Sequence, residues 1–92
     1  MTKVKPLLGR TGKPVANQYV IEDDHGIEYL QSYNSIIARK VGTEDETVEL
    51  DVKYWNYSVT TSKYRNQFLN ESTKETQAKI NSGEYKLVDL NN

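Results

Sequence analysis

Short apolar runs separated by polar turns occupy the chain from residue 18 to its middle. One run covers residues 19–21 and the next covers residues 27–31, with the polar segment 23–26 between them. Turn residues between two such runs are typical of a β-hairpin, and Gly26 can adopt the positive φ that a tight turn requires. The pattern predicts a hairpin over residues 18–32.

Two further strands are predicted before the helical part of the chain. Residues 36–41 form a third apolar run, and a polar loop follows at residues 42–46. Residues 47–52 then alternate, with three apolar side chains on one side and two carboxylates on the other. Alternation with a period of two indicates a half-buried strand.

The hydrophobic period changes to that of a helix after the fourth strand. Tyr57, Thr61, Tyr64 and Phe68 are spaced i, i+4, i+7 and i+11, which places them on one helical face. Ser58 is a suitable N-cap, because its hydroxyl can accept a hydrogen bond from an unpaired amide of the first turn. The spacing predicts a helix that begins at Ser58.

A second helix has the more complete signals at its ends. Ser72 and Glu75 have the spacing of a capping box, in which each side chain binds the other residue's backbone amide. The helix is expected to run to about Ser82, with Gly83 as its C-terminal stop. Residues 85–90 alternate again and predict a closing strand.

These elements predict an α+β fold with the order β-β-β-β-α-α-β. We expect a small antiparallel sheet with two short helices packed on one face, in a single domain over residues 18–92. Residues 1–17 contain two prolines, two glycines, four basic residues and no acid. This density of residues that break regular structure predicts a flexible basic N-terminal arm.

Composition places limits on the class of protein. The chain has no cysteine, which excludes disulfides and thiolate metal sites and favours a reducing cytoplasm. No apolar run approaches the ~20 residues of a membrane-spanning helix, so we expect a soluble cytoplasmic protein with no membrane partner. A net charge of −1 argues against the broad cationic surface of a dedicated duplex-DNA binder.

Patterns of catalytic or cofactor-binding residues are weak throughout the chain. Residues 9–13 lack the spacing of a phosphate-binding loop. His25 lies beside Asp23 and Asp24 in a predicted surface turn, without the further ligands of a transition-metal site. No pair of nucleophile and base stands out. We therefore expect a non-enzymatic protein without cofactor or metal.

The segment 54–69 concentrates aromatic rings and interleaves them with basic and amide side chains. Such a mixture suits nucleic acid, through stacking and phosphate contacts, and it equally suits a protein-interface hot spot. Lys63, Arg65 and Asn66 are expected on the face turned away from the sheet, where a partner can bind. Trp55 belongs either to that interface or to the core, and the sequence leaves this open.

An acidic cluster in the predicted loop before the fourth strand is a second candidate partner-binding surface. Its members are Glu44, Asp45 and Glu46. Carboxylates here could meet a basic nucleic-acid channel of a partner by charge complementarity. They could equally serve only the solubility of a small protein, and they lack the spacing and glycine of an EF-hand loop.

Several blocks of sequence resemble a family of small uncharacterised proteins from tailed-phage and prophage genomes. The blocks are residues 11–18, 31–38, 54–58, 60–69 and 82–87. The resemblance implies a phage accessory protein that works in the cytoplasm of a bacterial host cell. It implies no catalytic or binding residue, because the family has no established activity.

Two hypotheses about function follow. The first is a non-enzymatic phage accessory protein that binds and modulates a host or defence complex, in its sharpest form an anti-CRISPR-like inhibitor of a Cas nuclease. The second is a nucleic-acid-binding accessory protein that uses the basic arm and the helix face. The oligomeric state is open at this stage.

Overall fold

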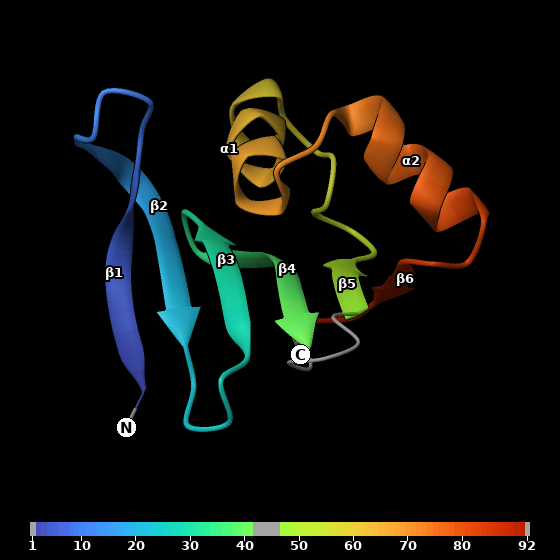
Figure 1. Ribbon diagram of the computed structural model, residues 1–92, viewed down its shortest axis with the longest axis horizontal. Helices are drawn as coiled ribbons and strands as arrows, with labels where there is room; N and C mark the ends of the chain where they lie inside the picture. Colours follow the sequence, from blue (N-terminus) through green and yellow to red (C-terminus); the bar gives the residue numbers. More distant parts are fainter. Residues whose placement is uncertain (1, 42–46, 92) are drawn as a thin grey trace.

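The strands of the protein lie in one sheet, in the order in which they occur along the chain (Figure 1). The computed structural model describes residues 2–41 and 47–91. The strands are β1 (Lys3–Leu8), β2 (Pro14–Glu22), β3 (Glu28–Ser32), β4 (Ser35–Val41), β5 (Thr47–Asp51) and β6 (Lys86–Val88), and the helices are α1 (Val59–Leu69) and α2 (Thr73–Asn81).

Strands β1 to β5 form an antiparallel meander, whereas β6 pairs with β5 in parallel. Both helices lie in the connection between β5 and β6, and Figure 1 shows them on one side of the sheet. Parallel neighbours need a long crossover of this kind. The α+β class and the two helices are confirmed. The sheet is mostly antiparallel, and its parallel pair of β5 and β6 arises because the helical crossover returns the chain to the end of the sheet at which β5 began.

The N-terminal segment is part of the sheet. Strand β1 and the start of β2 occupy residues 3–8 and 14–17, so the prediction of an arm without regular structure is wrong. Pro6 fits there because β1 is an edge strand, where a missing amide leaves no neighbour unpaired. Leu7 is the one buried residue of β1. The strand therefore lacks the alternation of apolar and polar residues by which a strand is recognised in a sequence.

The predicted hairpin and the two strands that follow it are confirmed. Asp23 closes the turn between β2 and β3, because its Oδ1 accepts hydrogen bonds from the backbone amides of His25 and Ile27 at 2.9 and 3.1 Å. Gly26 has the expected positive φ of 79°. His25 is exposed in this turn, and its backbone amide makes the contact that closes it.

Both helices begin at the predicted residues. The Ser58 side chain accepts a hydrogen bond from the Thr61 amide at 3.1 Å. Ser72 and Glu75 form the complete capping box, with bonds of 3.1 and 3.0 Å. Within residues 2–41 and 47–91, no helix is long and apolar enough to cross a membrane.

The core lies between the sheet and α1. Leu30, Ile37 and Leu50 contribute fully buried side chains from the strands, and Phe68 covers them from the helix. The buried positions of α1 agree in part with the predicted apolar face. Thr61 and Phe68 are buried, and the Thr61 hydroxyl bonds that of Ser32 at 2.9 Å. Trp55 and Tyr64 are half-buried against the core. Tyr57, which the spacing places on the same face, is 48% exposed and does not belong to the core.

Asp51, at the end of β5, joins the start of the linker to the C-terminal segment. Its side chain is buried, and Oδ2 accepts hydrogen bonds from the amides of Lys53 and Tyr54 at 3.0 and 2.8 Å. Its Oδ1 accepts the amide of Leu90 at 2.8 Å. Burial alone would raise the pKa of this carboxyl group, but the hydrogen bonds outweigh burial and lower it.

Arg65 is the largest fully buried side chain in the described residues, at 0% exposure. Its Nη1 donates to the backbone carbonyl of Trp55 and, at 3.3 Å, to Asn56 Oδ1. Its Nη2 donates to Asn66 Oδ1 at 3.0 Å and to Thr73 Oγ1 at 2.8 Å. The guanidinium also lies 5.1 Å from the centre of the Trp55 ring. One side chain therefore binds the linker before α1, α1 itself and the first residue of α2.

A buried cation must be compensated by hydrogen bonds or opposite charge, because its transfer out of water is costly. Burial lowers the pKa of Arg65, and the nearby negative charge of Glu71 opposes that effect. The pKa of arginine is so high in water that the side chain stays charged. Its acceptors would lose their donors if the guanidinium were removed.

We predict that Arg65→Met lowers the free energy of unfolding by about 2–4 kcal/mol, because each acceptor left unsatisfied costs roughly 1–3 kcal/mol. Urea denaturation followed by circular dichroism measures the change. The matched control is Lys63→Met on the exposed side of the same helix, which should stay within about 0.5 kcal/mol of the wild type. Equal stability of the two variants would contradict the role of Arg65.

Candidate functional site

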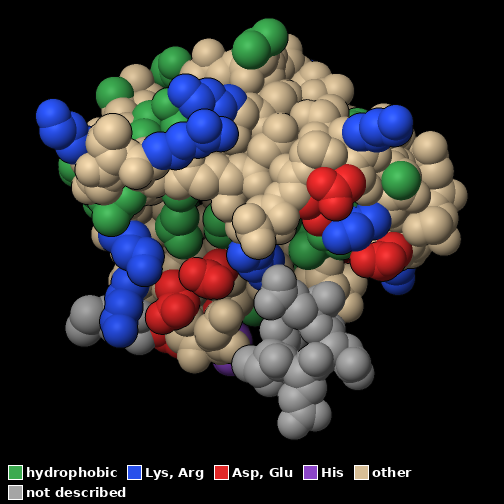
Figure 2. Space-filling view, turned by 45° about the horizontal axis from the view of Figure 1, so that its top comes forward, with side chains coloured by type: hydrophobic (Ala, Val, Ile, Leu, Met, Phe, Trp, Pro, Cys, Tyr) green, Lys and Arg blue, Asp and Glu red, His purple; other side chains and the backbone are tan. Residues whose placement is uncertain are grey.

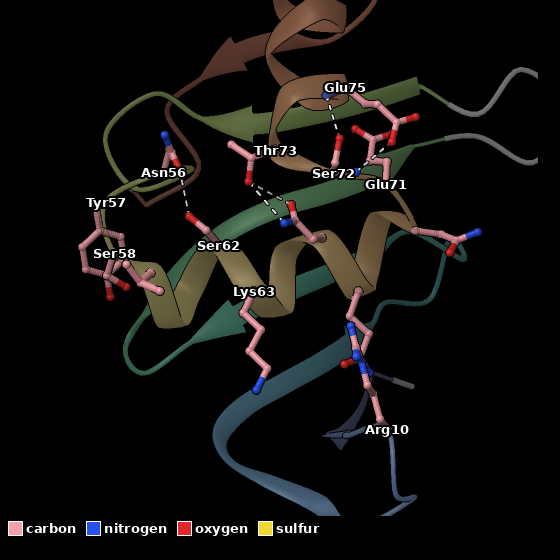
Figure 3. A pocket seen from close by; sticks show the side chains of 14 residues that line it. Arg10, Asn56, Tyr57, Ser58, Ser62, Lys63, Glu71, Ser72, Thr73 and Glu75 are labelled. Atoms are coloured by element: carbon pink, nitrogen blue, oxygen red, sulfur yellow. Dashed lines mark hydrogen bonds between the residues drawn. The ribbon is translucent and has the colours of Figure 1, made fainter.

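An open groove runs along the outer side of α1 (Figure 3). Its volume is about 970 Å³. The linker residues Asn56 and Tyr57 border one end, Lys63 and Asn66 of α1 lie along its length, and the start of α2 borders another side. The groove therefore lies above the segments that Arg65 holds together.

A second hollow adjoins the groove where the turn between β1 and β2 faces α1. Its volume is about 540 Å³, and Arg10, Lys13 and Lys63 are its three basic lining residues. Tyr64 and Gln67 of α1 also border it, and no acidic residue within 2–41 and 47–91 does. Arg10 and Lys63 line both the groove and the hollow, so the two form one continuous depression, here called the α1 groove.

The turn at residues 9–13 reaches α1 through local geometry and one long-range contact. Gly12 has a φ of 80°, a conformation that side chains disfavour. The Gly9 amide donates to the Lys13 carbonyl at 2.8 Å and closes the turn. Gln67 Nε2 on α1 donates to the Leu8 carbonyl. In Figure 3 the Lys63 side chain extends from α1 toward the side of the groove where Arg10 lies.

Two of the residues predicted to bind a partner line the α1 groove. Lys63 is exposed, and its Nζ lies 5.3 Å from the centre of the Tyr64 ring. Asn66 is half-buried, because its Oδ1 accepts from Arg65 while its Nδ2 donates to Thr73 at 3.2 Å. Both stay on the face of α1 that the sequence analysis assigned to them.

Arg65 and Trp55 do not belong to this surface. The expectation that Arg65 faces a partner is wrong, because its side chain is buried beneath the groove. Trp55 is half-buried, packs against the hydrophobic core and offers its carbonyl and its ring to Arg65. The candidate residues Glu44, Asp45 and Glu46 lie outside the described residues.

The position of Arg65 had a signal in the sequence. Thr61, Arg65 and Phe68 are spaced i, i+4 and i+7, and these are the three buried residues of α1. Arginine is seldom fully buried unless it is paired, so the hydrophobic period alone selects the tyrosines and not Arg65. The sequence pattern that identifies Arg65 is a polar residue that shares one helical face with Thr61 and Phe68.

The sequence predicts Arg10 and Lys13 in a flexible arm, whereas the structure places them beside α1. Their charge was evident from composition, but their position depends on the pairing of β1 with β2. Two exposed apolar side chains lie at the far end of the groove, Tyr57 at 48% exposure and Val59 at 89%. The spacing predicts Tyr57 on the apolar face of α1, and it does not single out Val59. The structure thus brings cations and exposed apolar groups to one surface.

The acidic residues that border the α1 groove are bound within the protein. The Glu71 side chain is 4% exposed, and its Oε1 accepts from Lys79 Nζ at 2.8 Å and from the Tyr85 hydroxyl at 2.7 Å. Glu75 belongs to the capping box of α2 with Ser72. Figure 3 shows Lys63 and Arg10 on the opposite side of α1 from Glu71 and Glu75, and in Figure 2 Lys and Arg side chains gather at the upper left, where the turn between β1 and β2 lies beside α1.

The cluster around Glu71 shifts the pKa values of its members. Burial alone would raise the pKa of Glu71, but hydrogen bonds from Lys79, Thr76 and Tyr85 lower it below the ordinary value of 4.5. The hydrogen bond to Glu71 raises the pKa of Lys79. Burial, together with the bond to Glu71, raises the pKa of Tyr85 to about 12. Lys79 is therefore cationic and Tyr85 neutral at physiological pH.

The lining residues of the α1 groove supply cations, amides, hydroxyl groups and an exposed ring. Among residues 2–41 and 47–91, no group of three or more acidic or histidine side chains is placed to hold a metal ion.

We predict that Glu71→Gln lowers the free energy of unfolding at pH 7 by about 1–3 kcal/mol, because charged hydrogen bonds to Lys79 and Tyr85 are weakened. The folded-state pKa of Glu71 is depressed, so its contribution is present above pH 4.5 and is lost as pH falls through the folded pKa. Urea denaturation at pH 7, 5 and 3 should show wild type and variant converging. Glu84→Gln, an exposed control, should show no such change. A constant difference at all three pH values would contradict the assignment.

Comparison with known proteins gives a family for this chain. No curated protein and no solved structure matches it. The model of a family of unknown function, DUF8033, matches residues 2–84, which is most of the chain and includes every segment that borders the α1 groove. The chain belongs to the family of unknown function DUF8033.

Proposed function

We propose that this protein is a non-enzymatic binding module that engages an anionic macromolecule through the α1 groove. One observation carries the proposal: Arg10, Lys13 and Lys63 come from two distant parts of the chain and surround one hollow that no acidic residue of the described ranges borders. Like charges repel, so their convergence costs free energy in the unbound protein. An anionic partner would offset that cost and gain from the fixed arrangement.

The construction of the α1 groove supports this proposal. The turn that carries Arg10 and Lys13 is closed by its own backbone bonds and tied to α1 by Gln67. Beneath the groove, Arg65 fixes the linker against both helices. A partner would therefore meet a surface that is largely ordered before binding, which lowers the entropic cost of association.

The biological setting of the proposal comes from the sequence blocks that resemble tailed-phage and prophage proteins. We propose a phage accessory protein that acts in the cytoplasm of a bacterial host cell and modulates a host or defence complex there. An anti-CRISPR-like inhibitor of a Cas nuclease is the sharpest form of this proposal. The acidic cluster 44–46, which would face a basic channel in such a target, lies outside the described residues.

We predict that Arg10→Glu together with Lys63→Glu abolishes capture of the partner from a bacterial host lysate at physiological salt. The bait is the immobilised full chain, with bound protein and nucleic acid quantified separately before and after nuclease treatment. Loss is expected because the double variant places two carboxylates in a site built for an anion.

The matched control is Lys5→Glu together with Lys74→Glu. These exposed lysines lie on β1 and α2, neither borders the α1 groove, and the change in net charge is the same. The control should retain the partner. Equal capture by wild type, groove variant and control, or equal loss from both variants, would contradict a binding site in the groove.

A further inference from the structure

We infer that the anionic partner of the α1 groove is a single strand of nucleic acid, with phosphates at the three cations and bases along the helix toward Tyr57. This inference rests on the proposed function and assigns its partner. It follows from the arrangement of charge, rings and amides along one helix.

The phosphate end is the hollow between the turn and α1. Within residues 2–41 and 47–91, Arg10, Lys13 and Lys63 form no ion pair with an acidic side chain. Each can therefore neutralise a phosphate of a bound strand. A nucleic-acid backbone carries one charge for every nucleotide, whereas carboxylates on a protein surface are scattered on flexible stems and pair weakly with exposed cations.

The base end is the surface near the N-terminus of α1. Tyr57 is 48% exposed, and a T-shaped contact with Tyr54 at 5.4 Å between ring centres holds its ring in place. Half-exposed rings of this kind are the platforms on which unpaired bases stack. The Asn56 side chain, exposed beside this ring, lines the groove with an amide group that can bond a base edge.

The dimensions of the α1 groove suit a short stretch of one strand. Helix α1 has 11 residues, which gives a length of about 16 Å. That is the axial length of about five nucleotides at ~3.4 Å each. Three cations in a narrow strip, on a chain with a net charge of −1, are too few for the broad phosphate surface of a duplex.

The acidic residues of the groove do not oppose this occupant at the cationic end. Glu71 is buried and bound to Lys79, and Glu75 is bound to the Ser72 amide at the start of α2. Figure 3 shows Lys63 and Arg10 on the side of α1 opposite Glu71 and Glu75, so a strand that runs from the hollow along Lys63 toward Tyr57 avoids both carboxylates.

Fluorescence anisotropy tests the inference, with a labelled 15-nucleotide oligo(dT) or oligo(U) titrated with the full chain between 50 and 200 mM salt. We expect both single strands to bind, with a slope of log K against log salt of about −2, because three neutralised phosphates each contribute ~0.7. A 15-base-pair duplex and polyglutamate, added as competitors at equal charge, should displace the strand poorly.

Two variants separate the two ends of the site. Lys63→Gln should make the salt slope shallower by about 0.7, since one phosphate contact is lost. Tyr57→Ala should weaken binding roughly 10-fold at every salt concentration without changing the slope, since one stacking platform is lost. Lys74→Gln is the control and should change neither. All three residues are exposed, and thermal melting should show that each variant is folded.

Absence of binding to either single strand would overturn the inference, as would equally strong competition by polyglutamate or unchanged affinity of Tyr57→Ala. A further outcome is that the single strands do not bind while the wild type captures a protein after nuclease treatment. If the Arg10 and Lys63 double variant then loses that protein, the partner is a protein. The proposed function then stands and the nucleic-acid inference fails. If the groove variants lose neither, both fail.

Discussion

The buried guanidinium of Arg65 is the interaction on which the surface architecture depends. A cation removed from water must be compensated by acceptors at fixed positions. Here the acceptors come from the linker before α1, from α1 itself and from the first residue of α2. The hydrogen bonds of its two terminal nitrogens thus hold the linker and both helices together. The α1 groove is the space that this arrangement leaves open.

The groove is assembled from local and distant parts of the chain. Lys63 and Asn66 lie on the outer side of α1 because Thr61, Arg65 and Phe68 occupy the inner side. Arg10 lies beside them because β1 pairs with β2 at the edge of the sheet and Gln67 binds the Leu8 carbonyl. Exposed cations are thereby carried on regular, hydrogen-bonded elements. Such placement lowers the conformational entropy that a binding site loses when its partner arrives.

Charge is divided between the inside and the outside of the protein. Asp51 and Glu71 are buried carboxylates that accept hydrogen bonds and tie the C-terminal part of the chain to the remainder. Their negative charge is used within the fold, while Arg10, Lys13 and Lys63 stay at the surface. A net charge of −1 therefore describes the surface of the α1 groove poorly. This division of charge is the physical basis on which we propose a cationic binding site for this weakly acidic member of DUF8033.

Elements with local signals could be predicted from the sequence alone. The hairpin turn with Gly26 and the capping box of Ser72 and Glu75 are closed by hydrogen bonds between residues a few positions apart, so a short stretch of sequence specifies them. Tertiary structure decided the rest. Strand β1 is an edge strand with one buried residue, and β6 is parallel only because of the crossover. Arg65 is buried because acceptors on both sides of it in sequence, up to ten residues away, converge on it. Burial of a charged side chain depends on hydrogen-bond partners elsewhere in the chain, and the local sequence pattern does not reveal them. For that reason the sequence identified the helix of the site, while the fold decided which of its charges face solvent.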